Sequence, residues 1–297
     1  MSRILLTGHR GYISGKLIPK LESLDYSVSR FDGDVAIRSN WFDHANIDYV
    51  IHLAAVNDLY AIEENYNLGY STNVWGSILA ADFCVRRHAK LIFLSTDTVL
   101  GPDGAGVPSS VYDSHKLAVE KIYAAIPELD SVALRLSTAY GHSPAISEQK
   151  NRGVVNKWIK SSIGGDTIKV YSGVANKRRD FVHVDDVVEA ITLAMSKDVP
   201  KGNYNICTGI GTTLMDMACK IDLLSGGSGV EIVPDPEGLN PIEYRTFVRD
   251  HNLFTFYTGW QPKIDLNVGV TKTIEAFGGR LKDWNVPKPV KKDCGCD

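Results

Sequence analysis

A short apolar strand that runs directly into two glycines constrains the N-terminal part of the chain. Residues 4–6 read Ile-Leu-Leu, and Gly8 and Gly11 follow. Apolar side chains then recur at helical spacing, at Ile13, Leu17, Leu21 and Leu24. Gly8 lets the chain turn without a Cβ clash, and Gly11 lets the backbone approach a pyrophosphate at the helix N-terminus. The pattern predicts a strand, turn and helix that bind a dinucleotide.

The glycine spacing alone is also compatible with a purely structural turn. It reads Gly-x-x-Gly, and Ser14 stands where a third glycine would let the helix pack closely on the strand. The second predicted strand, residues 26–31, ends at Asp32, where a carboxylate can hydrogen-bond a ribose diol. This acidic residue and the N-terminal place of the motif favour dinucleotide binding.

The composition is that of an ordinary globular chain. Of 297 residues, 44% are hydrophobic and 23% charged, and the net charge of −3 gives no support to nucleic-acid binding. No apolar run approaches the roughly 20 residues that span a bilayer, so no membrane contact is expected. The chain enters a core strand directly after Met1-Ser2-Arg3, which predicts no signal peptide and a cytoplasmic protein.

The cysteine spacing predicts no metal site. Cys84 and Cys207 lie in apolar segments, as expected for reduced, buried thiols. Cys294 and Cys296 lie in the last residues, which we expect to be a flexible tail. Metal binding or oxidation of these two cysteines stays open.

Strand and helix patterns alternate along the first half of the chain. Strands are expected at 48–55, 90–95 and 131–136, and helices at 72–88 and 112–126. This alternation predicts an α/β fold with a Rossmann-type, doubly wound parallel sheet. We expect residues 1–141 to form an NAD(P)-binding domain to which a segment near 180–210 returns. Residues 142–297 are expected to form mainly a smaller, C-terminal substrate-binding region.

Tyr112 and Lys116 lie four residues apart on a predicted helix, and therefore on one face of it. A phenol acts as a base at neutral pH only if its pKa falls from about 10, and a nearby ammonium together with a nicotinamide cation would lower it. Thr96 ends a predicted strand and offers a hydroxyl to a substrate oxygen. A Tyr-x-x-x-Lys pair alone also fits surface packing, but its place after a dinucleotide-type turn favours catalysis.

A basic run at 177–186 is the other notable feature. Its arginines suit bidentate binding of phosphate, and a solvated turn is the alternative interpretation. We interpret His183, within this run, as a hydrogen-bonded core histidine.

Together these residues resemble the extended short-chain dehydrogenase/reductase family, in its nucleotide-sugar epimerase/dehydratase branch. The resemblance spans nearly the whole chain. It is carried by Thr7-Gly8-x-x-Gly11-Tyr12-Ile13, His52-Leu53-Ala54-Ala55, Ser95-Thr96-Asp97, Tyr112-x-x-x-Lys116, 179–186, Tyr204-Asn205-Ile206 and Gly259-Trp260-Gln261-Pro262.

The resemblance implies the following roles. The catalytic residues are Thr96, Tyr112 and Lys116. The substrate-binding residues are Thr96, Asp97, Arg179 and Arg245, the two arginines contacting a nucleotide diphosphate. The cofactor-binding residues are Gly8, Arg10, Gly11, Tyr12, Ile13, Asp32, Asp34, Val35, Leu53, Ala54, Ala55, Asn73, Tyr112 and Lys116.

Two departures from the family pattern bear on the reaction. Dehydratases of this kind carry Thr-Asp-Glu, whereas this chain has Thr98 in place of the glutamate, which argues against 4,6-dehydration. The loop between Thr96 and Tyr112 is several residues shorter than usual.

The sequence therefore predicts an NAD-dependent epimerase of a nucleotide-diphosphate sugar that acts through a transient 4-keto intermediate. One alternative is an NADPH-dependent 4-keto-sugar nucleotide reductase or epimerase-reductase, in which Arg10 meets a 2′-phosphate. Asp32 argues against this alternative by charge repulsion, so NAD is favoured over NADP. A non-catalytic nucleotide-binding regulatory protein is the third hypothesis. The helices near 72–88 and 112–126 form a dimer interface in the family, and we expect a homodimer.

Overall fold

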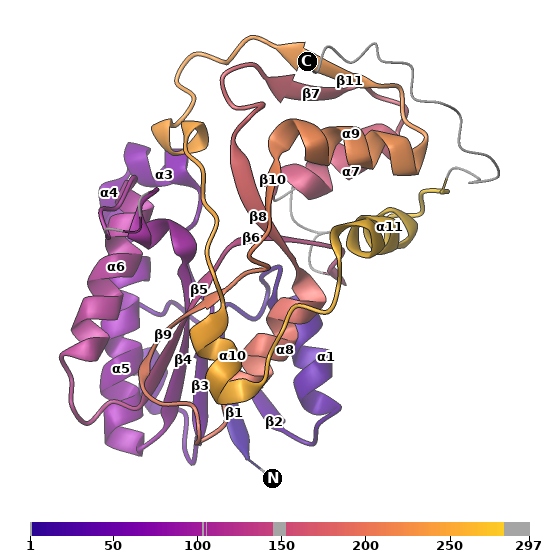
Figure 1. Ribbon diagram of the computed structural model, residues 1–297. Coiled ribbons are helices and arrows are strands. Elements are labelled where there is room, and N and C mark those ends of the chain that lie inside the picture. Colours follow the sequence, from indigo (N-terminus) through magenta and orange to yellow (C-terminus); the bar gives the residue numbers. More distant parts are fainter. Residues whose placement is uncertain (1, 103, 105, 145–152, 282–297) are drawn as a thin grey trace.

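The computed structural model describes residues 2–102, 104, 106–144 and 153–281. A parallel sheet with flanking helices occupies the lower part of Figure 1, and smaller sheets and helices lie above it. Within the described residues the large sheet has six strands in the order β2-β1-β3-β4-β5-β9, all paired in parallel. These strands are β1 (Arg3–Thr7), β2 (Ser27–Arg30), β3 (Tyr49–His52), β4 (Lys90–Thr96), β5 (Ser131–Leu136) and β9 (Gly202–Ile206). The predicted doubly wound sheet is confirmed.

Helices cover both faces of this sheet. Successive side chains of a strand point to opposite faces, and both faces of a parallel sheet are apolar and therefore need cover. Ile4 and Leu6 of β1 pack on one face, against α1, α8 and α10, while Leu5 packs on the other, against α2, α5 and α6. The first group comprises α1 (Ser14–Glu22), α8 (Val184–Ala194) and α10 (Asn252–Thr258), and the second α2 (Ser39–Phe42), α5 (Gly76–Arg87) and α6 (Val111–Ala124).

The helix expected over 72–88 is not regular at its start. Short helices α3 (Leu59–Glu64) and α4 (Tyr66–Tyr70) lead into a π-helical turn at Ser71–Trp75, and α5 begins only at Gly76. The wider turn carries Asn73, whose side chain pairs with both backbone groups of Val56 at 2.8 Å. A π-helical turn within a helix often marks a functional region, and the apolar periodicity of the sequence did not reveal it.

The smaller part has its own apolar core. A three-stranded sheet, in the order β10-β8-β6, lies between the large sheet and a two-stranded sheet of β7 and β11 (Figure 1). The strands are β6 (Thr138–Tyr140), β7 (Ile168–Tyr171), β8 (Arg178–His183), β10 (Gly211–Thr213) and β11 (Val230–Val233), and the helices α7 (Val154–Ile163), α9 (Leu214–Ser225) and α11 (Leu266–Ala276). After β8, the chain returns to the large sheet through α8 and β9.

No helix in the described part of the chain is both long and apolar enough to cross a membrane. The tail that carries Cys294 and Cys296 lies outside the described residues.

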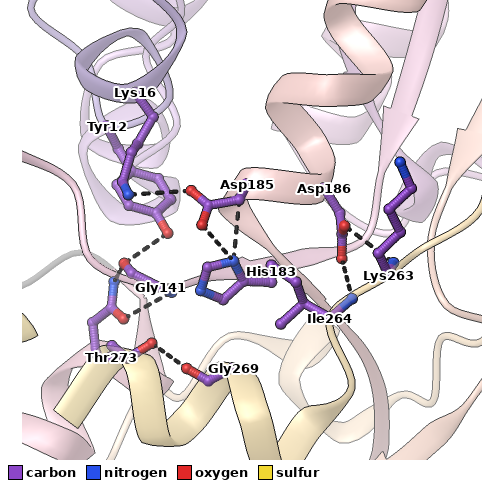
Figure 2. A network of polar contacts seen from close by, with 11 residues as sticks. Tyr12, Lys16, Gly141, His183, Asp185, Asp186, Lys263, Ile264, Gly269 and Thr273 are labelled. Carbon is purple, nitrogen blue, oxygen red and sulfur yellow. Dashed lines mark hydrogen bonds and ion pairs between the residues drawn. The ribbon is translucent and has the colours of Figure 1, made fainter. Parts of the chain in front are cut away.

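A network of polar contacts ties the glycine turn to the smaller part (Figure 2). The Tyr12 hydroxyl donates to the carbonyl of Gly141 at 2.9 Å, and Lys16 pairs with Asp185 at 3.1 Å. His183 Nδ1 accepts the backbone N–H of Asp185 at 3.2 Å and so caps α8. Burial lowers the pKa of His183 to about 4, which keeps the ring neutral. The interpretation of His183 as a hydrogen-bonded core residue is confirmed.

The adjacent Asp186 holds the C-terminal segment. Its carboxylate accepts the backbone N–H groups of Lys263 and Ile264, both at 3.1 Å (Figure 2). Its carbonyl accepts the Trp260 indole N–H at 3.1 Å. The acidic pair at the start of α8 therefore joins this helix to α1 and to the segment at 260–264.

Candidate active site

A cavity of about 830 Å³ lies over the carboxyl ends of β1, β3 and β4. Ligands of open α/β sheets bind at this edge, because the loops that follow the strands diverge there. Every residue predicted to bind cofactor lines this cavity except Asn73, and Thr96 lines it too. One cavity thus brings together the glycine turn, Asp32 and the Tyr112–Lys116 pair.

The glycine turn requires glycine at Gly8 for two reasons. Its φ of +68° is costly for a residue with a side chain, and an added Cβ would lie 2.7 Å from the backbone nitrogen of Ala54. The N–H of Gly11 donates to the Gly8 carbonyl at 2.8 Å. Ser14 Oγ donates to the same carbonyl at 2.8 Å. The serine that replaces the third glycine therefore stabilises the turn.

Charged side chains line the cavity beside the glycine turn. Asp32 lies beside His9 Nε2 at 3.4 Å and Arg10 at 3.8 Å. Asp34 Oδ1 accepts the backbone N–H of Ala36 at 2.9 Å, which shapes the loop after β2. An exposed carboxylate at the end of the second strand suits a ribose diol.

Buried polar groups whose mutual contacts the sequence did not predict lie beneath the cavity. Thr7 Oγ1 bonds His52 Nδ1 at 2.8 Å and accepts the backbone N–H of Ala54 at 3.1 Å. His52 Nε2 bonds Ser77 Oγ at 3.1 Å. Burial lowers the pKa of His52 to about 3, so the ring is neutral and acts as a fixed hydrogen-bond bridge. Asn73 braces the neighbouring loop without lining the cavity.

Lys116 lies deep beside Tyr112. Its Nζ donates to the Leu94 carbonyl at 2.7 Å and lies 4.4 Å from the centroid of the Phe93 ring and 5.8 Å from that of Tyr112. Burial lowers the pKa of Lys116 to about 7. Burial raises the pKa of Tyr112, and the Asp113 charge raises it further. The expected lowering of the Tyr112 pKa therefore does not arise from the protein alone, because burial and the Asp113 charge both raise it.

A chain of hydrogen bonds leads away from Thr96. Its hydroxyl bonds that of Thr98 at 2.8 Å, and Thr98 donates to Asp113 Oδ1 at 2.5 Å. The sequence analysis named Thr98 only as a departure from the dehydratase pattern, and it missed Asp113. The place of Asp113 next to Tyr112 in the sequence could have pointed to a role in the site. Asp97, predicted to contact substrate, is 5% exposed and does not line the cavity. Burial raises the pKa of Asp97 to about 7.

The two predicted phosphate-binding arginines lie near a second cavity of about 820 Å³ in the smaller part, which Arg179 lines. The Arg179 guanidinium donates to the carbonyls of Glu243 at 3.0 Å and of Arg245, and lies 3.5 Å from the Glu243 carboxylate. Arg245 Nη1 donates to Ser109 Oγ at 3.1 Å. Both arginines are thus held in place by protein groups, and Arg245 reaches the loop that precedes Tyr112.

The cavity residues fit an NAD molecule. A turn whose glycine admits no Cβ suits a pyrophosphate, the Asp32 carboxylate suits the adenosine ribose, and Tyr112 and Lys116 line the same cavity.

The chain is similar over most of its length to known enzymes of nucleotide-sugar metabolism. A curated UDP-glucose 4-epimerase from Mycolicibacterium smegmatis is 28% identical over 93% of this chain and 98% of its own length. UDP-glucuronic acid decarboxylase 1 from Danio rerio is 24% identical over 97% of this chain and 76% of its own length. The crystal structure of a UDP-glucose 4-epimerase from Thermotoga maritima with UDP-glucose superposes with a TM-score of 0.84 at 24% identity, covering 93% of this chain and 98% of that one.

These relatives are enzymes that act on nucleotide sugars, as the motifs implied. The model of the NAD dependent epimerase/dehydratase family matches residues 4–207, which include the glycine turn, Thr96 and the Tyr112–Lys116 pair. The chain is therefore a member of the NAD dependent epimerase/dehydratase family.

Proposed function

We propose that this protein is an NAD-dependent epimerase of a nucleotide-diphosphate sugar that acts through a transient 4-keto intermediate. The observation that carries the proposal is the single cavity that joins a pyrophosphate-type turn at Gly8 to Thr96, Tyr112 and Lys116. NAD, when bound, accepts a hydride from the sugar carbon and returns it to the opposite face.

Three side chains of the site have separate roles in the reaction. Tyr112 takes the proton of the sugar 4-hydroxyl and later gives it back. Lys116 is fixed by the Leu94 carbonyl at 2.7 Å, where its protonated form favours the phenolate. Because burial raises the pKa of Tyr112, the base form requires the positive charge of Lys116 and of a nicotinamide ring together. Thr96 hydrogen-bonds an oxygen of the sugar.

The second cavity supports a nucleotide-diphosphate substrate. Arg179, Lys157 and Lys169 line it together with three acidic residues, Asp166, Glu231 and Glu243. Trp158 and Tyr171 add aromatic surface suited to a base. We assign this cavity to the nucleotide part of the substrate, with Arg245 at the diphosphate.

Reduction of a 4-keto sugar is the second candidate. The raised pKa of Tyr112 favours this reaction, since a protonated phenol is the required acid. Asp32, next to Arg10, disfavours the 2′-phosphate of NADPH by charge repulsion. The presence of Thr96, Tyr112 and Lys116 in one cavity disfavours the third hypothesis, a protein without turnover.

We also propose a homodimer. Large side chains are exposed on α3, α4 and the following π-helical turn, namely Tyr60 at 51%, Tyr66 at 61%, Tyr70 at 53% and Trp75 at 41%. Such a concentration of aromatic surface is typical of an interaction site. The surface lies at the end of the helix layer formed by α5 and α6 (Figure 1).

A redox balance distinguishes the candidates. Purified protein is incubated with UDP- and dTDP-hexoses, and product, NADH and NADPH are quantified. The proposal predicts bound NAD and interconversion of hexoses with no net change in nicotinamide. Stoichiometric NADPH oxidation with a 4-keto sugar supports the reductase, and no turnover over a broad panel supports the non-catalytic protein.

A further inference from the structure

The wall of the cofactor cavity comes from two parts of the chain. Residues 8–14, the glycine turn and the start of α1, follow the first strand of the large sheet. Ala139 lies in β6 of the three-stranded sheet, and Gly153 precedes α7 of the smaller part. NAD in this cavity is therefore bordered by both parts, so its way in and out depends on how firmly they are joined.

Tyr12 joins the two parts through its side chain and its backbone. Its hydroxyl donates to the Gly141 carbonyl at 2.9 Å (Figure 2), and its own carbonyl accepts the hydroxyl proton of Ser143 at 2.6 Å. The Asn156 side chain of α7 holds Gly141 in turn, at 3.2 Å from its nitrogen and 3.1 Å from its carbonyl oxygen. Ser143 is fully buried, so loss of its hydroxyl would leave the Tyr12 carbonyl without that partner.

An ion pair one turn further along α1 adds a third contact. Lys16 Nζ lies 3.1 Å from Asp185 Oδ1 (Figure 2). The backbone N–H of Asp185 donates to His183 Nδ1 at 3.2 Å, so the pair ties α1 to the end of β8, a strand of the three-stranded sheet. The Lys16 and Asp185 side chains are 33% and 40% exposed, and they lie outside the cavity lining. The pair therefore acts on the arrangement of the two parts and makes no direct contact with NAD.

We propose that these contacts form a clasp, defined by Tyr12, Ser143 and the Lys16–Asp185 pair, that must open before NAD enters or leaves the cavity. Each contact joins protein groups, so the clasp favours the closed arrangement to the same extent with and without NAD. It therefore slows binding and release by the same factor and leaves the dissociation constant unchanged.

Slow exchange of the cofactor suits an epimerase better than a reductase. An epimerase regenerates its NAD in each cycle, because the hydride returns to the sugar, and so one cofactor serves many turnovers. A reductase consumes NADPH and must exchange it in every turnover, so the clasp would limit its rate. The exchange itself is measured without any sugar, and the clasp therefore stands or falls independently of the proposed reaction.

Release is measured by stopped-flow fluorescence, in which protein loaded with NADH is mixed with excess NAD, and equilibrium titration with NADH gives the dissociation constant. Ser143→Ala should release NADH about tenfold faster, since it leaves a buried carbonyl unpaired in the closed form. Lys16→Met and Asp185→Asn should each release it about two- to fivefold faster, as expected for a partly exposed ion pair. These two substitutions change the local charge in opposite directions, so a faster release in both isolates the effect of the clasp. The dissociation constant should stay close to that of the wild-type protein in all three variants.

Lys263→Met is the matched control. Lys263 pairs with Glu189 of α8 at 2.5 Å, a pair that includes no residue of the glycine turn or of α1, so the control should keep the wild-type release rate. Wild-type release rates in Ser143→Ala, Lys16→Met and Asp185→Asn overturn the inference. A faster release that is matched by an equal loss of affinity also overturns it, since the residues would then hold NAD itself. If Ser143→Ala does not fold, the two variants of the ion pair decide.

Discussion

Replacing Gly8 by alanine tests whether the glycine turn packs directly on the end of β3. The new Cβ would lie 2.7 Å from the nitrogen of Ala54 and 2.8 Å from the carbonyl carbon of Leu53. Both are backbone atoms, so no side chain can rotate away, and the turn or the strand end must move. Gly8→Ala also places alanine at a φ of +68°, which costs about 1–2 kcal/mol.

Gly259 offers a matched control. It follows α10 with a φ of +69°, and an added Cβ there meets no atom within 4 Å. Gly259→Ala therefore has the same backbone strain without the clash. The clash should add about 1–3 kcal/mol, the usual cost of overpacking, so Gly8→Ala should lose about 2–5 kcal/mol and Gly259→Ala about 1–2 kcal/mol.

The measurement is urea unfolding of both variants and the wild-type protein, followed by circular dichroism, with NAD affinity from calorimetry. Gly8→Ala should also lose NAD affinity, whereas Gly259→Ala should retain it. Equal destabilisation by the two substitutions would refute the close approach of the turn to β3. Normal NAD affinity in Gly8→Ala would remove the turn from the cofactor site.

Three further changes test the site. Tyr112→Phe should lower kcat by about a hundredfold or more while NAD affinity, measured by calorimetry, stays normal; near-normal kcat would exclude Tyr112 as acid or base. Asp97→Asn should raise the free energy of unfolding, and the gain over the wild-type protein should grow as pH rises from 4 to 8. Burial raises the pKa of Asp97 from 3.8 to about 7, so over this range the folded wild-type protein keeps a proton that its unfolded chain has lost. The gain measured by urea unfolding is at most about 4 kcal/mol, and a gain that does not change with pH would contradict this reasoning. Asp32→Ala should weaken NAD binding about tenfold more than NADP binding; equal weakening would contradict contact with the ribose diol.

The sequence was sufficient for the sheet and the cofactor cavity because both depend on local patterns. The alternation of strand and helix predicts where each apolar strand lies in the sheet. It also places the two glycines and Asp32 at the ends of their strands. The carboxyl ends of parallel strands meet at one edge, so residues distant in sequence could be placed together before the structure was known.

The polar support of the site was not predictable in this way. His52 bridges Thr7 and Ser77 across two strands and a helix, and no local pattern encodes such a contact. The pKa of Tyr112 depends mainly on burial, which the sequence does not quantify. Asp97 was assigned to substrate by resemblance, yet it lies buried outside the cavity lining.

The most direct test of the account follows the hydride itself. Purified protein is given UDP-glucose deuterated at C4, and the product is analysed by NMR and mass spectrometry together with the protein-bound nicotinamide. The account predicts a C4 epimer that retains its deuterium, with no net NADH. Loss of the deuterium to solvent would contradict an epimerase that oxidises and reduces the same carbon. The same conclusion follows if the C4 configuration of UDP-glucose never changes while another sugar nucleotide is reduced at the expense of NADPH.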